Sequence, residues 1–232
     1  MTVDESVLAA LRALDTPTVC NAIEVLAPER RGRGYTTRPL VSCTPQLGAM
    51  VGHAVTGTLR AMHPSGLDKA EQRERRLAWY RYVEASPRPS VVVIQDLDSQ
   101  PGYGSFWGEV NTAVHQGLGA AGVVTDGSVR DLDACAEGFH MLAGLVAPSH
   151  AWVRIEEFGI AVTVAGMTVR PGDLVHADRH GAVVVPHAIA ADVPAAAAAI
   201  ARGEAVIIEA ARKPGFTVDA LAEAMLRRDD IH

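Results

Sequence analysis

The amino-acid sequence predicts an α/β protein with a mixed sheet. Apolar stretches of strand length alternate with stretches of helical periodicity, a pattern that ordinarily indicates a parallel, doubly wound sheet. Residues 160–185 break this pattern, because they have the features of consecutive hairpins, and Ala165-Gly166 suits the turn of one of them. No linker rich in Pro, Ser or Gly divides the 232 residues, so we expect one domain over 1–232.

In the N-terminal half, caps and prolines delimit the expected elements. A helix is expected over 4–14, and Asp15-Thr16-Pro17 caps a second helix that runs to about Leu26. One or two strands follow over 48–59. A helix over 67–84 should place one set of side chains near a single face: Leu67, Ala70, Leu77, Tyr80 and Val83. Pro87 and Pro89 then break the chain before a buried strand, Val91–Ile94.

In the C-terminal half, strands dominate until an Ala-rich stretch begins. The expected helices are 108–118, about 131–138, 188–202 and a further helix to the end, so that about 188–232 forms a helical extension. The expected strands are 121–125, 142–146, 152–155, 160–165, 167–170, 173–177 and 181–185.

Two neighbouring motifs carry the candidate site. The buried strand 120–125 runs into an Asp126-Gly127 turn, and Arg130 and Asp131 follow it. A carboxylate there can hold a hard cation, and a guanidinium can bind an oxyanion at two points. An isolated Arg-Asp pair is more often part of a solvated loop. Upstream, however, a Gly-rich turn opens a helix near Gly108, and helix N-termini bind anions. The two motifs together indicate a site for a small anionic, metal-chelating ligand.

Composition excludes several classes of protein. The net charge is −6 and no basic stripe is present, which argues against nucleic-acid binding. We expect no membrane segment, because no run of about 18 apolar residues occurs, and no secretory signal. Cys20, Cys43 and Cys135 suggest neither a disulfide framework nor a zinc site, which favours the cytoplasm. The glycines at 117, 119 and 122 precede a strand, so they do not form a dinucleotide-binding turn.

The motifs resemble those of the RraA-like family, which includes the 4-hydroxy-4-methyl-2-oxoglutarate aldolases and regulators of ribonuclease E activity. The matching residues are Trp107-Gly108-Glu109, Gly119, Gly122, Val124, Asp126-Gly127, Arg130-Asp131 and the segment Arg170–Pro186. The resemblance covers about residues 15–60 and 90–215. It implies a three-layer β/β/α swivelling-domain sandwich that assembles as a homotrimer or homohexamer.

The resemblance also implies a role for each residue. Asp131 matches the metal ligand, with waters completing the shell of Mg²⁺ or Mn²⁺. Arg130 matches the residue that holds the substrate's keto oxygen. The pyruvyl carboxylate would lie on the backbone of Gly108, Glu109, Val110 and Asn111. Glu109 would organise metal-bound water and transfer a proton, although an acidic residue there equally suits a helix N-terminus.

Other features remain alternatives or departures from the family pattern. Glu204 and Glu209 lie where family members contribute acids to a neighbour's substrate, and an exposed helix face is the simpler reading. The long 64–89 segment and Asn21 depart from the pattern, as does Arg179-His180. At the position of Arg179-His180 the family pattern has an acidic pair. His176 and His180 are too far apart in a strand to share a metal, so we expect a surface role.

The way in which the enolate of pyruvate must be stabilised indicates the class of enzyme to expect. Cleavage of a 4-hydroxy-2-oxo acid needs a lysine Schiff base or a divalent metal to stabilise the pyruvate enolate. Neither Lys69 nor Lys213 has an apolar setting, which favours the metal. We therefore expect a metal-dependent lyase of the class II aldolase type that releases pyruvate and also decarboxylates oxaloacetate. The alternative is a non-catalytic, protein-binding regulator of the ribonuclease E inhibitor type.

Overall fold

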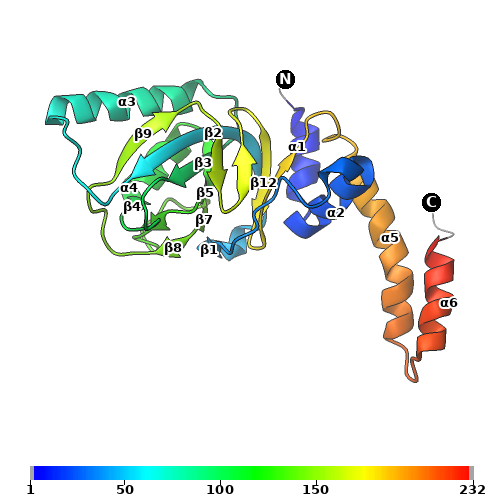
Figure 1. The fold of residues 1–232 in the computed structure, drawn as a ribbon. Helices are drawn as coiled ribbons and strands as arrows, with labels where there is room; N and C mark the ends of the chain where they lie inside the picture. The colour runs from blue at the N-terminus through cyan, green and yellow to red at the C-terminus, as the bar shows by residue number, and fades with distance from the viewer. Residues whose placement is uncertain (1–2, 230–232) are drawn as a thin grey trace.

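A curled mixed sheet is the centre of the computed structural model, which describes residues 3–229 (Figure 1). Its strands are β1 (Val41–Ser42), β2 (Met50–Arg60), β3 (Ser90–Asp96), β5 (Ala120–Thr125), β7 (His140–Ala143), β9 (Arg154–Phe158), β12 (Leu174–Asp178) and β13 (Gly181–Val185). Three short strands form a second sheet: β4 (Ser105–Trp107), β6 (Ser128–Val129) and β8 (Leu145–Val146). The hairpin strands are β10 (Val162–Val164) and β11 (Met167–Val169). The helices are α1 (Glu5–Arg12), α2 (Thr16–Leu26), α3 (Lys69–Ala85), α4 (Glu109–Gly117), α5 (Val193–Ala211) and α6 (Val218–Asp229).

The sheet order confirms the predicted mixture of strand directions. The strands lie in the order β1-β7-β5-β3-β2-β12-β13, and β9 also pairs with β2. The pairs β2–β3, β3–β5 and β5–β7 are parallel, whereas β1, β9, β12 and β13 join antiparallel. The apolar runs of the inner strands are explained by this arrangement, because both faces of the sheet are covered.

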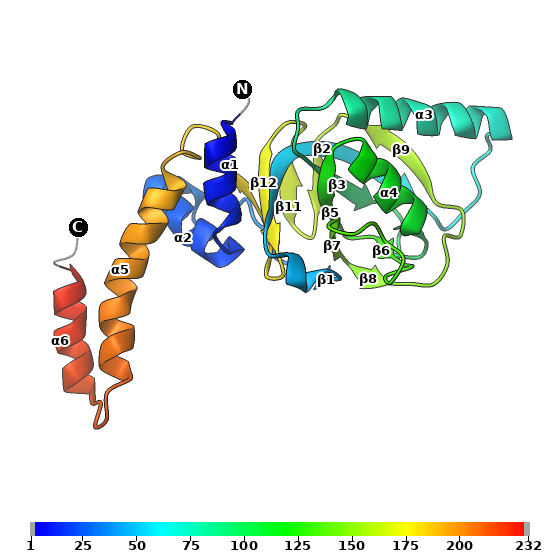
Figure 2. The same ribbon diagram turned by 180° about the vertical axis from the view of Figure 1, so that it is seen from behind.

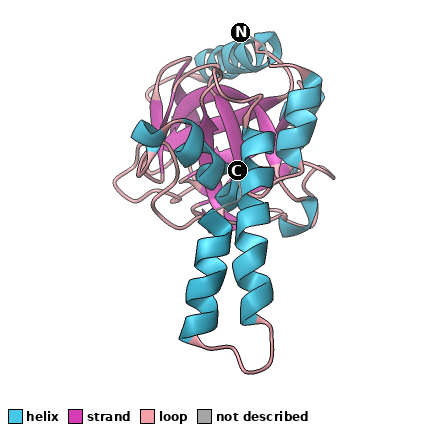
Figure 3. Cartoon of the chain, turned by 90° about the vertical axis from the view of Figure 1, so that its right-hand side faces the viewer, coloured by secondary structure: helices cyan, strands magenta, loops and turns pink. Residues whose placement is uncertain are grey.

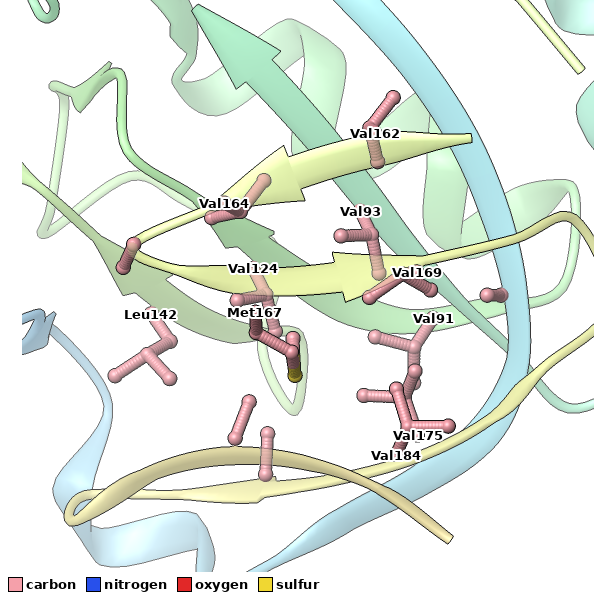
Figure 4. Packing of buried hydrophobic residues seen from close by; sticks show 14 of the residues in the cluster. Val91, Val93, Val124, Leu142, Val162, Val164, Met167, Val169, Val175 and Val184 are labelled. Carbon is pink, nitrogen blue, oxygen red and sulfur yellow. The ribbon is translucent and has the colours of Figure 1, made fainter. Parts of the chain in front are cut away.

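Successive side chains of β3 enter two different cores, as the pleat requires. Val91 and Val93 face the β10–β11 hairpin, whose Val164 and Met167 lie over them and Val124 (Figure 4). Val92 and Ile94 face the helices on the opposite side. The predicted Ala165-Gly166 turn is confirmed, since both residues have positive φ, as a two-residue type I′ hairpin turn requires. Hairpin, sheet and helices are the three layers of the β/β/α arrangement.

Helix α3 lies along the outside of the helical layer (Figure 1). A capping box between Asp68 and Glu71 starts it, and Trp79 and Val83 attach it to the core. The predicted inner face was therefore partly wrong: Leu77 is 41% exposed, while Trp79 is fully buried. Tyr80 and Tyr82 also pack against this core, so the aromatic residues determine which face of this polar helix is buried.

Helices α1 and α2 cover the β12–β13 end of the sheet, together with the beginning of α5. Asp15 caps α2 as predicted, by accepting a hydrogen bond from the Thr18 amide. The remainder of α5 pairs with α6 and projects from the body as a helical arm (Figure 3). The long helix runs from Val193 to Ala211 and not over 188–202. Every helix within residues 3–229 is too short or too polar to span a bilayer.

Two other predicted elements differ from the structure. No helix forms over 131–138. Asp131 has a φ of 53°, and the segment turns so that Phe139 can enter the core. Thr112 fixes this turn by accepting a hydrogen bond from the Ala136 amide. The single strand expected at 142–146 is two strands, β7 and β8, which belong to different sheets and are separated by Gly144.

Candidate active site

The pairing of β4 with β6 brings the two sequence motifs together. The strands are parallel, with Trp107 opposite Val129, so Gly108 and Arg130 leave their carboxyl ends side by side. The Arg130 amide donates a hydrogen bond to the Trp107 carbonyl (2.9 Å). Helix α4 begins directly after Gly108, so its N-terminus lies next to the Arg130-Asp131 turn. Figure 2 shows α4 and β6 near one another on this side.

Gly108 makes room for the Asp131 carboxylate. A Cβ atom at position 108 would lie 2.6 Å from Asp131 Oδ2 and 3.2 Å from Arg130 Cγ. Asp131 itself is in the left-handed region, which Asp and Asn tolerate better than most residues. Its carbonyl accepts hydrogen bonds from the Ala134 and Cys135 amides, which fixes the turn. Strained backbone that is held this firmly is often found at functional sites.

The first turn of α4 offers free backbone donors. Gly108 is the N-cap and has no side chain that could cap the helix, so the amides of residues 109–111 lack an intrahelical acceptor. The partial positive charge of the helix end adds to their attraction for an anion. Arg130 contributes the full positive charge beside them.

The carboxylates of this region suit a hard cation with a mostly aqueous shell. Arg130 Nε lies 3.5 Å from Asp131 Oδ2, and the two side chains are 35% and 37% exposed. Glu109 is also exposed, at the first position of α4. Within residues 3–229 no group of three or more His, Cys, Asp and Glu side chains could hold a metal. One protein carboxylate plus waters and ligand oxygens is, however, a normal environment for Mg²⁺. The space above Gly108 keeps the Asp131 carboxylate available for this.

Asn111 connects the N-terminus of α4 to α3. The Tyr80 hydroxyl donates to Asn111 Oδ1 (2.9 Å), and Asn111 Nδ2 donates to the Phe106 carbonyl. Burial raises the pKa of Tyr80, so the phenol stays protonated at neutral pH. The carboxamide is thus oriented from both ends.

His115 reinforces the same connection from within the core. Its Nε2 accepts a hydrogen bond from Trp79 Nε1 (2.9 Å), so its Nδ1 carries the proton and donates to the Asn111 carbonyl (2.6 Å). Burial lowers the pKa of His115 to about 4, which keeps the ring neutral.

A cavity of about 450 Å³ opens between α3, the start of α4 and the strand β9. Val110, Asn111 and Arg130 line it, whereas Gly108, Glu109 and Asp131 lie beside the lining. The other lining residues are Pro64, Ser65, Leu67, Gln72, Arg75, Arg76, Tyr80, Ser105, Phe106, His150, Ala151, Trp152, Val153, Arg154 and Ile155. The structure therefore places the predicted residues in one locality at the edge of a cavity that the motifs alone did not reveal.

The wall formed by α3 was missed from the sequence. The short basic cluster at 73–76 is typical of a solvated helix face, yet Arg75 and Arg76 line the cavity. The available signal was the Trp79-Tyr80 pair within an otherwise polar helix, because buried aromatic residues need a partner surface. That surface is helix α4, where Trp79 contacts His115 and Tyr80 contacts Asn111.

Several other candidates lie outside this region. His176 was expected at the surface but is fully buried, with Nδ1 3.0 Å from the Thr16 hydroxyl and Nε2 3.1 Å from the Leu11 carbonyl. It joins β12 to α1 and α2. His180 lies in the next turn against Asp178. Glu204 and Glu209 are exposed on the arm.

Asp126 has a structural role beside the site. Its Oδ1 accepts the Asp96 amide (2.9 Å), and Arg38 lies 3.8 Å from its Oδ2. Burial raises the pKa of the Asp126 carboxyl, while the Asp96 amide opposes this.

Comparisons with known proteins agree with this architecture. A family model described as RraA-like, Aldolase/RraA, matches residues 11–184. Over 75 residues the chain is 39% identical to a protein of Pseudomonas aeruginosa that is provisionally named a 4-hydroxy-4-methyl-2-oxoglutarate aldolase. That stretch is 31% of this chain and 45% of the relative, so the match spans less than half of the relative's length.

Two solved structures resemble almost the whole molecule. An uncharacterized protein of Pseudomonas syringae pv. tomato superposes with a TM-score of 0.72 at 27% identity, covering 98% of this chain and 96% of that one. RraAS2 of Streptomyces coelicolor, described as an unusual member of the RNase ES inhibitor RraA protein family, gives a TM-score of 0.67 at 23% identity. This second alignment covers 88% of this chain and 96% of that one.

Proposed function

The chain belongs to the RraA-like family, and we propose that it is a divalent-metal-dependent carbon–carbon lyase. It would cleave a 4-hydroxy-2-oxo acid to pyruvate in the manner of a class II aldolase. The observation that carries this proposal is the juxtaposition of Arg130 with the uncapped N-terminus of α4 at the edge of the cavity.

This arrangement suits the pyruvyl end of such a substrate. The free amides of residues 109–111 would bind its carboxylate, because they point along the helix axis with no acceptor of their own. The Arg130 guanidinium would hold the ketone oxygen, on which negative charge develops as the bond between C3 and C4 breaks. Fixed donors at that oxygen stabilise the transition state more than the ground state.

Asp131 would hold Mg²⁺ or Mn²⁺ through its carboxylate, with waters and substrate oxygens as further ligands. The ion, when bound, supplies Lewis-acid stabilisation of charge on the substrate oxygens. Glu109 is the neighbouring exposed carboxylate, so it is the candidate to take the proton of the 4-hydroxyl group. A Schiff base is disfavoured, because neither Lys69 nor Lys213 lines the cavity.

The same residues would also support decarboxylation of oxaloacetate. Loss of CO₂ from its C4 leaves the same enolate of pyruvate, which Arg130 would stabilise in the same way. Oxaloacetate is therefore a practical first substrate, since it does not depend on knowing the distal part of the natural one.

The test is release of pyruvate from oxaloacetate and from 4-hydroxy-2-oxo acids, followed with a coupled NADH assay. Turnover should need Mg²⁺ or Mn²⁺, disappear with EDTA and return when the ion is added back. No pyruvate above the metal-only rate for any of these substrates would overturn the proposal. Inhibition of a ribonuclease E by the same preparation would then favour the protein-binding regulator that the family includes.

A further inference from the structure

We infer that α3 carries the specificity determinant for the distal end of the substrate, with Arg76 binding a second anionic group there. This inference rests on the proposed function, because it takes the pyruvyl end to lie at Arg130 and α4. It goes beyond that function by assigning the wall of the cavity that α3 forms and the charge of the group that binds there.

The first observation is the charge of the cavity lining. Among the described residues that line it, four are arginines and none is acidic: Arg75, Arg76, Arg130 and Arg154. Only Arg130 belongs to the pyruvyl end. The other three come from α3 and β9, whereas Arg130 directly follows β6.

The second observation is that these distal arginines differ in what they contact. Arg154 Nε lies 2.7 Å from Glu156 Oε1, and Arg75 Nη1 lies 4.0 Å from Glu156 Oε2. The Glu156 carboxylate therefore lies close to the guanidinium groups of both Arg75 and Arg154. Within residues 3–229, Arg76 has neither a carboxylate within 4.0 Å nor a hydrogen-bond partner. It is the cavity arginine with a free guanidinium.

The third observation is the position of Arg76 relative to the pyruvyl end. Arg76 and Tyr80 are four residues apart on α3, so they lie on the same face one turn from each other. Tyr80 donates to Asn111, whose helix turn would bind the pyruvyl carboxylate. Arg76 also favours the charged form of Tyr80, although burial outweighs it. Tyr80 thus separates the proposed pyruvyl site from Arg76.

The size of the cavity supports an extended ligand. About 450 Å³ is in the range of pockets that hold drug-sized molecules and is far larger than pyruvate needs. Apolar residues, among them Phe106, Trp152 and Ile155, also line this space. The ligand that fits this distribution is a 2-oxo acid with an anionic group at its far end, either a carboxylate or a phosphate.

Unreactive 2-oxo acids can test this without depending on turnover. We would measure the binding of 2-oxoglutarate, 2-oxo-4-phosphonobutyrate and 2-oxopentanoate, whose distal end carries no charge, by calorimetry in the presence of Mg²⁺. The wild-type protein should bind at least one of the two anionic compounds roughly tenfold more tightly than 2-oxopentanoate, since a charge-assisted hydrogen bond typically has that effect. Whichever compound is preferred identifies the distal group.

Arg76→Gln should abolish this preference and leave the affinity for 2-oxopentanoate within about twofold. Arg73→Gln is the matched control, because Arg73 is exposed on the same helix but does not line the cavity. It should behave like the wild type. Equal affinity of the wild type for compounds with and without a distal charge, or a preference that survives Arg76→Gln, would overturn the inference.

The two proposals can fail separately. If the lyase proposal is correct and the inference is wrong, pyruvate is released from oxaloacetate but the calorimetric preference is absent. If the preference depends on Arg76 and no substrate is turned over, the distal site stands and the lyase proposal falls.

Discussion

Arg130 and Asp131 occupy different positions relative to the cavity although they are adjacent in the chain. Arg130 lines the cavity, whereas Asp131 lies beside it in a left-handed turn over Gly108. The backbone of Asp131 thus matters as well as its charge. A test of the metal site must separate these two contributions.

Asp131→Asn keeps the shape and tolerates the positive φ, but it removes the negative charge. We expect metal-dependent turnover to disappear while the melting temperature stays within a few degrees of the wild type. Asp131→Ala should lose turnover equally and also cost about 1–2 kcal/mol of stability, because alanine disfavours that backbone region. Asp133→Asn, an exposed site two residues on, is the control. Full activity of Asp131→Asn with unchanged EDTA sensitivity would exclude the residue as the metal ligand.

Arg130→Ala tests whether this side chain acts on the transition state. Donors placed at a developing oxyanion contribute ~3–4 kcal/mol, so kcat should fall roughly 10²–10³-fold. Arg130→Lys should recover only part of that loss, since an ammonium group cannot reproduce the two-point contact. Steady-state kinetics with oxaloacetate would show this. A variant in which only KM rises would mean that Arg130 binds the ground state and transition state equally.

At the scale of elements, the contact between α3 and α4 shapes the cavity. Trp79 and His115 form its buried part, and Tyr80 with Asn111 forms the part that faces the cavity. The aromatic rings of Trp79, Tyr80, Phe106 and Trp107 all lie with centroids within 6 Å of the His115 ring. A neutral histidine therefore holds a helix that would otherwise have little apolar surface.

This contact predicts a pH dependence of stability. The pKa of His115 falls from 6.5 to about 4 on folding, so the unfolded chain binds the extra proton between these values. The free energy of unfolding should therefore decrease as the pH falls from about 6.5 to about 4, with about 3 kcal/mol from this residue. Denaturant titrations of wild type and His115→Gln at several pH values would measure it. The variant should lose less stability over that range, and parallel curves would contradict the assignment.

Local patterns were sufficient to predict most elements, and long-range contacts explain the failures. The Asp15 cap, the strand 120–125 and the Ala165-Gly166 turn depend on neighbouring residues, and the structure contains all three. The face of α3 and the turn at 131–138 depend on partners far along the chain, namely His115 for Trp79 and Thr112 for Ala136.

The residues of the candidate site also divide into those that local motifs predict and those that only the folded chain brings together. Arg130, Asp131 and Gly108 could be predicted because each lies in a recognisable motif beside a strand end. The distal wall could not, since Arg76 and Trp152 become neighbours of one cavity only after the chain has folded.

At the scale of the whole molecule, the arm of α5 and α6 lies at the opposite end from α3, α4 and β9 (Figure 1), the elements that form the walls of the cavity. Glu204 and Glu209 are on this arm, so any role in catalysis would have to be at the cavity of another copy. We expect a trimer or hexamer of the 24.5 kDa chain, with identical sites at each boundary. Light scattering at micromolar concentration would give three or six times that mass.

A mixing experiment tests the shared site directly. If the neighbour's acid is required, combining inactive Asp131→Asn with a Glu204→Gln/Glu209→Gln double variant should restore part of the activity. A fully active monomer, or full activity of the double variant alone, would rule out a shared site.

The central position of β2 has a consequence for how the chain is made. Residues 50–53 pair with residues 174–177, on one edge of the strand, whereas its other edge pairs with β3 early in the sequence. During synthesis, residues 50–53 therefore remain without their partner strand until more than a hundred further residues have left the ribosome. Unpaired strand edges recruit other chains. The nascent protein is therefore most prone to aggregate late in translation, and a chain truncated before residue 174 should be insoluble although it contains Arg76, Arg130 and Asp131.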